Sequence, residues 1–229
     1  MNAHDLAARL TGTRVVPVVT IDSADDAVGL GDALAAGGLP LAEITFRTDA
    51  AAAAIEALRA ARPDVLVGAG TVLDAATVDR AVTAGAEFIV APGFNPSVVD
   101  RCRELGVAVV PGVVTPTEIE AARARGLSLL KFFPAEAAGG VRYLSAVAAP
   151  YRGIRFMPTG GVSPANLAAY LALPHVAACG GTWIATADAI RSHRFDEITR
   201  LAAEALAIAG ATGARPGADP KPDKPAQAS

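Results

Sequence analysis

The sequence has little cysteine and no excess of charge of either sign. Its 229 residues include 2 Cys, 20 Lys and Arg, and 23 Asp and Glu, which gives a formal net charge of -3. Cys102 and Cys179 form neither a CxxC pair nor a Cys/His cluster, which excludes a disulfide framework and a zinc site of the usual spacing. Without a run of Lys and Arg, the chain lacks a cationic surface for a row of phosphodiesters. We therefore expect reduced thiols, no nucleic-acid partner and, as ligand, a small anion at most.

We also expect neither a secretion signal nor a membrane span. Met1–Leu10 contains charged residues and no continuous apolar stretch, unlike a signal peptide. Ala165–Ala187 contains no Asp, Glu, Lys or Arg and is long enough to cross a bilayer. However, Pro174 and the pair Gly180-Gly181 interrupt it, which favours a helix, a turn and a buried strand. We expect a cytoplasmic protein without a membrane partner.

Short runs of β-branched residues alternate with longer Ala- and Leu-rich segments along most of the chain. This alternation is typical of βα units around a parallel sheet. The predicted strands are Val15–Thr20, Leu41–Phe46, Val65–Ala69, Glu87–Ala91, Val107–Val110, Ser128–Phe132, Ile154–Pro158 and Val176–Cys179. The helices predicted between them are Ser23–Ala36, Asp49–Ala61, Asp74–Ala84, Pro96–Leu105, Pro116–Arg125 and Pro164–Ala172.

This order of elements predicts an α/β fold with a single (β/α)8 TIM barrel over residues 1–210. Strands buried on both faces explain why the predicted strands are apolar along their whole length. An extra N-terminal helix at His4–Leu10 is expected to cover the barrel floor, and Phe195–Ala209 is expected to close the outer ring. Residues 211–229 are rich in Pro and Ala with nothing to bury, so we predict a disordered tail.

The most informative single residue is a lysine inside an apolar strand, in SLLKFFPAE. Period-two alternation places Leu129, Lys131 and Phe133 on one face, and Leu130 and Phe132 on the other. One interpretation is an ion-paired or snorkelling lysine at a strand end. The other is a lysine whose desolvation leaves a fraction as free amine, which can attack a carbonyl carbon and form a Schiff base.

A second set of polar residues lies on the second predicted strand, in LAEITFRT. Glu43, Thr45 and Arg47 alternate with apolar residues, so Glu43 and Arg47 share a face. A carboxylate there can exchange protons beside the lysine, and a guanidinium can bind a substrate carboxylate through two hydrogen bonds. A structural ion pair of Glu43 with Arg47 or with Lys131 is the alternative interpretation.

Two glycine-rich segments, PTGGVSP at Pro158–Pro164 and GGTW at Gly180–Trp183, each follow a strand late in the chain. In such barrels this region often binds phosphate through backbone N–H groups and a helix N-terminus. Glycine is needed where the backbone approaches an anion closely, although simple turn formation is the alternative. GAGTV at Gly68–Val72 lacks the complete spacing of a dinucleotide-binding motif.

The histidines and two aspartates receive structural assignments. His4, His175 and His193 show no metal-ligand spacing and no adjacent Ser or Cys nucleophile motif, so we predict turn or surface roles and no metal site. Asp22 and Asp49 stand at predicted helix starts, where we expect them to cap the helices.

The motifs VVPVVTID, LAEITFRT, VGAGTV, APGFNP, KFFPAE, MPTGGVSPAN and GGTW, in this order, resemble those of the 2-keto-3-deoxy-6-phosphogluconate aldolase / 4-hydroxy-2-oxoglutarate aldolase family. The resemblance extends from Val15 to about Ala209, and the joint occurrence of the motifs makes it specific. It implies a class I aldolase, a lyase of the Entner-Doudoroff pathway and carbohydrate metabolism. It also implies a (β/α)8 barrel, a homotrimer, and no metal or other cofactor.

The resemblance also implies a role for each matched residue. Lys131 matches the Schiff-base lysine, and Glu43 matches the general acid/base. The residues matched to binding of the substrate carboxylate are Arg47, Thr71 and Thr159. The residues matched to the pocket are Phe133 and Pro92, and those matched to the phosphate site are Gly160, Gly161, Gly181 and Thr182. In the last motif GGTW replaces the GGSW of the best-known members, which keeps the hydroxyl and adds a methyl group.

The implied reaction cleaves 2-dehydro-3-deoxy-6-phosphogluconate to pyruvate and glyceraldehyde 3-phosphate, with slower cleavage of 4-hydroxy-2-oxoglutarate to pyruvate and glyoxylate. Three alternatives stay open. One is an aldolase for 2-dehydro-3-deoxy-6-phosphogalactonate, and another is a phosphate-binding barrel isomerase or synthase, which has no need of the lysine in KFFP. The third is a barrel that binds a phosphorylated sugar acid without turning it over.

Overall fold

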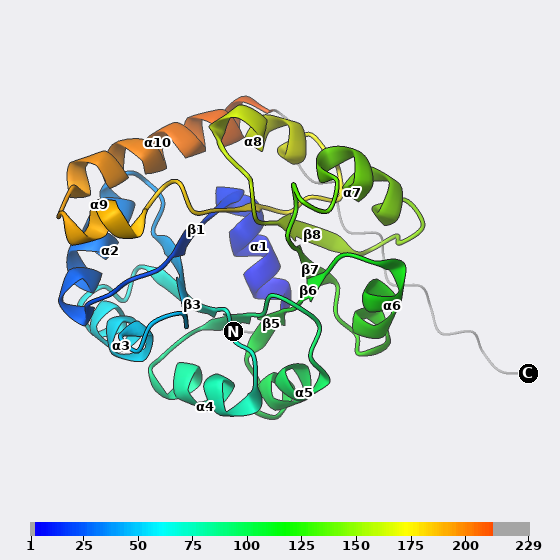
Figure 1. Ribbon diagram of the computed structural model, residues 1–229, viewed down its shortest axis with the longest axis horizontal. Coiled ribbons are helices and arrows are strands. Elements are labelled where there is room, and N and C mark those ends of the chain that lie inside the picture. Colours follow the sequence, from blue (N-terminus) through cyan, green and yellow to red (C-terminus); the bar gives the residue numbers. More distant parts are fainter. Residues whose placement is uncertain (1–2, 213–229) are drawn as a thin grey trace, which may run out of the picture.

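An inner ring of parallel strands and an outer ring of helices make up the computed structural model, which describes residues 3–212 (Figure 1). The strands are β1 (Val15–Val19), β2 (Leu41–Thr45), β3 (Leu66–Gly70), β4 (Phe88–Val90), β5 (Ala108–Val110), β6 (Gly112–Val113), β7 (Leu129–Phe132), β8 (Arg155–Pro158) and β9 (Cys179–Gly181). They pair in the orders β5-β4-β3-β2-β1-β9 and β6-β7-β8. Parallel bridges from Phe156 to Val176 and from Thr159 to Gly180 close the ring between β8 and β9.

β5 and β6 are two halves of one barrel strand, interrupted at Pro111. β5 pairs with β4 and β6 pairs with β7, so the ring passes through the interruption. Proline has no N–H to donate to a ladder, whereas its carbonyl accepts a 2.9 Å hydrogen bond from the Lys131 N–H. A Cβ at Gly112 would lie 2.0 Å from the Pro92 carbonyl oxygen, so only glycine allows this close approach. With the two halves counted as one strand, the described residues confirm the predicted (β/α)8 barrel.

The helices surround the strands. They are α2 (Ala27–Ala36), α3 (Ala51–Ala61), α4 (Ala75–Thr83), α5 (Pro96–Glu104), α6 (Pro116–Ala124), α7 (Gly140–Ala148), α8 (Pro164–Leu171), α9 (Ala187–Arg191) and α10 (Phe195–Ala211). The sequence prediction omits α7 and α9. Gly139, at φ 110°, is the N-cap of α7, and Gly140, at φ 62°, is its first residue, so a pair that is typical of a turn here starts a helix.

The predicted boundaries need three corrections. The helix predicted over Ser23–Ala36 consists of a 3-10 turn, η1 (Ala24–Asp26), followed by α2. The last strand begins at Cys179, where the prediction ended it, because Val176 forms only the isolated bridge. α10 extends to Ala211, beyond the predicted end of the barrel domain. The tail predicted to be disordered falls, for residues 213–229, outside the described part of the chain.

The capping predictions for Asp22 and Asp49 are wrong. Ser23 caps η1, because its side chain accepts a hydrogen bond from the Asp25 N–H, and Ala50 precedes α3 without a side-chain cap. The Asp22 carboxylate instead accepts a 3.0 Å hydrogen bond from Arg191. Both carboxylates come one residue too early in the chain for the N-cap position.

Two apolar cores lie on opposite sides of the strands. The outer core, between strands and helices, includes Leu130 and Phe132 of β7. The inner core fills the amino-terminal half of the barrel, where Leu6 and Leu10 of α1 (Ala3–Thr13) pack with inward residues such as Leu129. Figure 1 shows α1 inside the ring of strands in this view, which confirms the predicted floor helix. The period-two alternation predicted for β7 is also confirmed.

Candidate active site

The carboxyl-terminal half of the barrel interior is polar. Among residues 3–212, the buried polar or charged residues are Glu43, Thr45, Lys131 and Thr159. The inward face of β2 carries Leu41 in the apolar floor and then Glu43 and Thr45 toward the mouth. Strand alternation directs all three side chains inward, and their position along the strand decides whether they lie in the apolar floor or at the polar mouth.

Lys131 and Glu43 meet inside the barrel. The Lys131 Nζ lies 3.2 Å from the Glu43 Oε1, although the two residues are 88 positions apart in the chain. Lys131 is 5% exposed and Glu43 is 0% exposed. Burial penalises both charges, and the ion pair offsets part of that penalty. The ion pair considered in the sequence interpretation therefore exists, and it joins the two groups assigned to the chemistry.

Lys131 also stands out by composition. The sequence contains three lysines, and the other two, Lys221 and Lys224, fall outside the described residues. Arginine supplies the remaining basic side chains. An arginine would serve an ion pair equally well but has no neutral amine at physiological pH. A lysine at this one buried position therefore favours chemistry that requires an amine.

The Glu43 carboxylate has one oxygen free for a ligand. Its Oε2 accepts no hydrogen bond within the described structure and is inaccessible to solvent. A buried acceptor without a donor is costly, and a substrate hydroxyl or a water molecule can supply the donor. A Cβ at Gly70 would lie 2.3 Å from the Glu43 Oε1, so the glycine at the end of β3 makes room for this carboxylate.

Phe133 forms one wall beside the amine. Its ring centroid lies 5.3 Å from the Lys131 Nζ, within the range of a cation–π contact. A Cβ at Gly160 would come within 3.2 Å of the same ring. Phe133 therefore lies between the lysine and the first glycine-rich turn, and its role in the pocket stays a prediction.

Arg47 and Thr71 line a common cavity of about 260 Å³. The other residues lining it are Phe46, Thr48, Asp49, Leu73, Asp74, Thr77 and Arg80. Within residues 3–212, Arg47 forms no hydrogen bond or ion pair, so its guanidinium is available to an anion. Thr71 has φ 57°, a conformation that β-branched residues rarely adopt. Such strain persists where the surrounding structure enforces it, often at functional sites.

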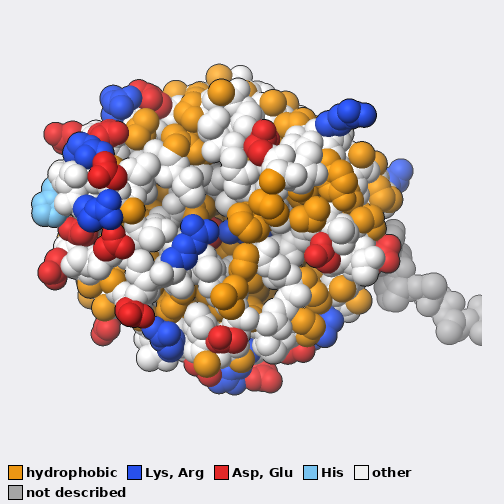
Figure 2. Space-filling view, viewed as in Figure 1, with side chains coloured by type: hydrophobic (Ala, Val, Ile, Leu, Met, Phe, Trp, Pro, Cys, Tyr) orange, Lys and Arg blue, Asp and Glu red, His pale blue; other side chains and the backbone are white. Residues whose placement is uncertain are grey.

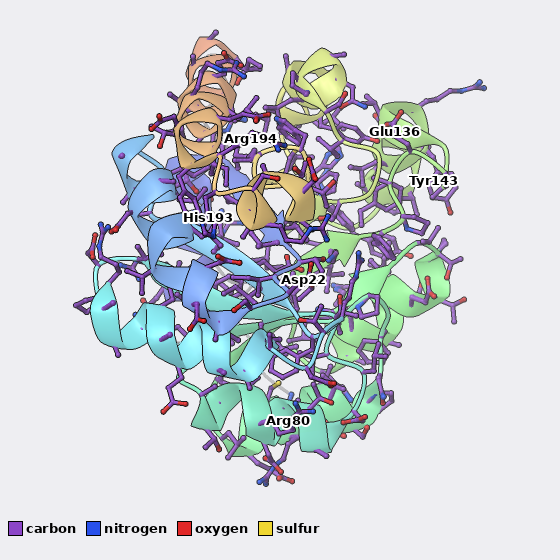
Figure 3. All side chains as sticks on the ribbon, turned by 60° about the vertical axis from the view of Figure 1, so that its left-hand side comes forward. Asp22, Arg80, Glu136, Tyr143, His193 and Arg194 are labelled. Atoms are coloured by element: carbon purple, nitrogen blue, oxygen red, sulfur yellow. The ribbon has the colours of Figure 1, made fainter. Side chains whose placement is uncertain are left out.

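Arg80 contributes a second guanidinium that the sequence reasoning missed. Its guanidinium carbon lies 5.5 Å from the centroid of the Phe46 ring, and Figure 3 shows its position on α4. Asp74 caps α4, because its carboxylate accepts a 2.7 Å hydrogen bond from the Thr77 N–H. This hydrogen bond lowers the pKa of the Asp74 carboxyl, and the charge on Arg80 lowers it further to a smaller extent. A solvent-facing arginine in a helix carries no sequence signal of a site, since only the packing of α4 brings it to the cavity.

Thr159 and Pro92 lie near the mouth but outside that cavity. Thr159 follows β8, and its Oγ1 would lie 2.3 Å from a Cβ at Gly180, so it fills the space between β8 and β9. Pro92 follows β4 and contacts Gly112 through its carbonyl. Of the predicted carboxylate set, Arg47 and Thr71 line the same cavity. The roles of Arg47, Thr71, Thr159 and Pro92 stay predictions.

The two glycine-rich segments lie side by side. Gly160 and Gly161 have φ 94° and 82°, which other residues rarely adopt, and the bridge of Thr159 with Gly180 joins this turn to β9. At Gly181 a Cβ would collide with the Trp183 ring, and Thr182 is exposed beside it. A glycine turn shortly before a helix N-terminus, here that of α8 with Ser163 as N-cap, is suited to bind an anion.

The space-filling view shows the face of the molecule that is seen in Figure 1. Lys or Arg side chains lie near its centre next to hydrophobic ones (Figure 2). Among residues 3–212, no group of three or more His, Cys, Asp and Glu side chains is arranged to hold a metal ion, and no helix is long and apolar enough to span a membrane.

Both cysteines, His175 and His193 lie outside the site. Burial raises the pKa of the Cys102 thiol to about 12 and also raises that of Cys179, which disfavours a reactive thiolate at either position. Burial lowers the pKa of His175, which packs edge-on against Phe156. His193 pairs with Asp26 at 2.9 Å on the surface. These contacts agree with the structural roles assigned to both histidines.

Comparison with known sequences gives one consistent family. The family model described as KDPG and KHG aldolase matches residues 6–201. A 2-dehydro-3-deoxy-phosphogluconate aldolase of Haemophilus influenzae is 48% identical over 205 residues, which cover 90% of this chain and 97% of the relative. An enzyme of the same name from Treponema pallidum is 49% identical over 201 residues, covering 88% and 96%.

Solved structures agree with the sequences. The KDPG aldolase of Legionella pneumophila, with pyruvate captured as a covalent carbinolamine intermediate, has a TM-score of 0.83 and 38% identity, and covers 86% of this chain and 96% of its own. The 2-keto-3-deoxy-6-phosphogluconate aldolase of Zymomonas mobilis with 3-phosphoglycerate has a TM-score of 0.83 and 37% identity, covering 90% and 97%. From its sequence, its barrel and the groups gathered at the barrel mouth, this chain belongs to the KDPG and KHG aldolase family.

Proposed function

We propose that this protein is a class I aldolase that cleaves 2-dehydro-3-deoxy-6-phosphogluconate to pyruvate and glyceraldehyde 3-phosphate through a Schiff base on Lys131. The observation that carries the proposal is the buried contact of 3.2 Å between the Lys131 amine and the Glu43 carboxylate. Such a pair supplies the nucleophile and the proton acceptor that aldol cleavage requires. The names of the relatives, and the covalent pyruvate adduct in the Legionella enzyme, support the same chemistry.

The reaction begins with attack of the Lys131 Nζ on the C2 carbonyl carbon. The resulting carbinolamine loses water and becomes an iminium ion. The C4 hydroxyl then gives its proton to Glu43, directly or through water, while the C3–C4 bond breaks and its electron pair moves toward the iminium nitrogen. This step releases the aldehyde and leaves an enamine. The enamine takes a proton at C3, and water hydrolyses the new iminium to pyruvate and free lysine.

The carboxylate of the pyruvyl half is assigned to Arg47, Thr71 and Thr159. The Arg47 guanidinium has no partner within the described residues, so an incoming carboxylate displaces no ion pair. Holding C1 fixes the position of C2 near the amine, which converts attack into an intramolecular step. The walls of the pocket are assigned to Phe133 and Pro92.

The phosphate is assigned to the second end of the site. The residues proposed to bind it are Gly160, Gly161, Gly181 and Thr182, through backbone N–H groups and one hydroxyl. Cleavage of 4-hydroxy-2-oxoglutarate is expected to be slower, because this substrate shares the pyruvyl half but has no phosphate. The homotrimer and the cytoplasmic location implied by the resemblance belong to the same proposal.

The galactonate-derived substrate is the second candidate. A structure described as native KDPGal has a TM-score of 0.79 and 28% identity, covering 86% of this chain and 95% of its own. The two substrates differ at C4, where Glu43 is proposed to act. Cleavage rates measured with both C4 epimers distinguish the candidates, and we expect the gluconate-derived epimer to be preferred.

Trapping with borohydride tests the mechanism. The full chain is incubated with pyruvate and borohydride, and peptides are analysed by mass spectrometry. We expect a reduced pyruvyl adduct on Lys131 and none on Lys221 or Lys224, which serve as controls within the same chain. A folded protein that gives no adduct in excess pyruvate would refute the Schiff-base proposal, as would equal labelling of all three lysines.

A further inference from the structure

A glutamate and a tyrosine without a role in the proposed reaction lie directly behind the turn formed by Gly160 and Gly161. Glu136 belongs to the loop between β7 and α7, and Tyr170 belongs to α8. The Tyr170 hydroxyl donates a hydrogen bond to the Glu136 Oε1. Figure 3 shows Glu136 beside α7. The pair thus connects the loop that follows the Lys131 strand with the helix that follows the glycine turn.

Backbone hydrogen bonds tie the same loop to the glycine turn. The Ala135 N–H donates to the Thr159 carbonyl at 2.8 Å, and the Glu136 N–H donates to the Gly160 carbonyl at 3.0 Å. A movement of Glu136 would therefore move the carbonyl groups of the turn. It would also change the orientation of the N–H groups of the turn.

The Glu136 side chain also fills the space behind the turn. A Cβ at Gly161 would lie 2.6 Å from both the Cβ and the Cγ of Glu136. On the other side, a Cβ at Gly140 would lie 3.1 Å from the Glu136 Oε1 and 3.5 Å from the Tyr170 hydroxyl. The aliphatic part of Glu136 thus packs against Gly161, while its carboxylate is anchored next to Gly140.

Because Glu136 is negatively charged, the position of its carboxylate affects the binding of an anion at the turn. A carboxylate that is free to approach an anion site repels the anion. Tyr170 is fully buried, and burial, followed by the hydrogen bond to Glu136, raises the pKa of its phenol, so it stays a proton donor at neutral pH. The hydroxyl therefore holds the carboxylate in one place through a charge-assisted hydrogen bond.

We propose that Glu136 and Tyr170 are positioning residues for the phosphate end of the substrate, which hold the Gly160-Gly161 turn in the conformation that binds a phosphate monoester. The inference rests on the proposed function, because it assumes that the phosphorylated substrate occupies this turn. Neither side chain contacts the reacting atoms. Their loss is therefore expected to change KM for the phosphorylated substrate rather than kcat or the reaction with pyruvate.

The test begins with Tyr170→Phe, which removes one hydroxyl and keeps the ring. We expect KM for the phosphorylated substrate to rise about fivefold to tenfold, as for loss of one hydrogen bond to a charged group. We expect kcat, and the pyruvate concentration needed for half-maximal borohydride trapping, to stay within about twofold of the wild type. Glu136→Gln keeps an acceptor for the Tyr170 hydroxyl and is expected to retain the wild-type KM, whereas Glu136→Ala is expected to match Tyr170→Phe.

The matched control is Tyr151→Phe. The Tyr151 hydroxyl also donates to a carboxylate, that of Glu120, at 3.1 Å, but Tyr151 precedes β8 and so lies at the opposite end of that strand from the turn. We expect no change of KM in this control. An unchanged KM in both Tyr170→Phe and Glu136→Ala would overturn the inference, and so would an equal loss of pyruvate trapping.

Glu136→Ala and the wild-type protein serve as two further controls. Glu136 is exposed and lies in a loop, so Glu136→Ala provides a folded variant even if the change at buried Tyr170 prevents folding. Failure of the wild-type protein to trap pyruvate would refute the proposed function instead, and that outcome is separate from a variant whose KM does not change.

Discussion

The two halves of the barrel interior are built from the same strands and behave in opposite ways. The amino-terminal half is an apolar floor in which Leu41 and Leu129 pack against Leu10 of α1. The carboxyl-terminal half contains the pair of Glu43 and Lys131. On both β2 and β7, a shift of two residues along the strand separates a floor residue from a site residue.

The difference shows how stability and chemistry are divided along each strand. The floor stabilises the fold by removing apolar surface from water, a contribution that does not depend on direction. The ion pair at the mouth adds little net stability, because the desolvation of both charges opposes their attraction. We therefore expect substitutions in the floor to lower the free energy of unfolding, and substitutions at the mouth to lower the rate of reaction.

The largest expected effect is that of Lys131→Ala. Loss of the nucleophile is expected to lower kcat for aldol cleavage by about 10⁵-fold or more. Lys131→Arg keeps a cation beside Glu43 and is expected to be equally inactive, because a guanidinium does not form the imine. Circular dichroism checks that both variants fold. Turnover in either folded variant would break the proposed division between the two halves.

Glu43→Gln is expected to have the next largest effect. Removal of the proton acceptor is expected to slow cleavage by about 10²- to 10⁴-fold, while pyruvate still forms an imine with Lys131. Steady-state rates measure the first effect, and borohydride trapping measures the second. An unchanged cleavage rate would remove Glu43 from its proposed role.

Leu10→Ala tests the floor. Truncation of this fully buried side chain is expected to lower the free energy of unfolding by about 2 to 5 kcal/mol. Urea unfolding measures the loss, and the kcat of the folded protein is expected to stay unchanged. The control is Val28→Ala on the exposed side of α2, where we expect a change within about 0.5 kcal/mol. A lower kcat in folded Leu10→Ala would show that the two halves are coupled.

The smallest expected effect is that of Thr182→Ala. Loss of one hydroxyl is expected to raise KM for the phosphorylated substrate about threefold to tenfold, with less effect on 4-hydroxy-2-oxoglutarate. Thr182→Ser keeps the hydroxyl and is expected to behave like the wild type. Equal effects of the alanine variant on both substrates would mean that Thr182 does not contact the phosphate.

Several elements could be predicted from local patterns. Alternation on the predicted strands separated the two faces of β2 and β7, and the structure shows that the faces with Glu43 and Lys131 point into the barrel. The Gly160-Gly161 turn could be predicted because its conformation requires glycine. These features depend on the residue itself and its immediate neighbours.

Other elements could not be predicted, because they depend on packing. No helix was predicted over α7, because the Gly139-Gly140 pair at its start is typical of a turn. In the sequence, Arg80 resembles any solvent-facing arginine of a helix. Only the packing of α4 beside the loop that carries Phe46 brings it to the cavity. The hydrogen bond between Glu136 and Tyr170 joins residues 34 positions apart, and no local spacing indicates it.

The sequence by itself determined the approximate positions of eight strands, the separation of Glu43 and Lys131 from the apolar set of their own strands, and the turns that favour glycine. Only the tertiary structure decided that Lys131 meets Glu43, that Arg47 and Thr71 share a cavity, and that the two glycine-rich segments lie side by side. The physical reason is that periodicity sets the direction of a side chain relative to its own strand. Which strands face each other across the interior is set by the closure of the barrel.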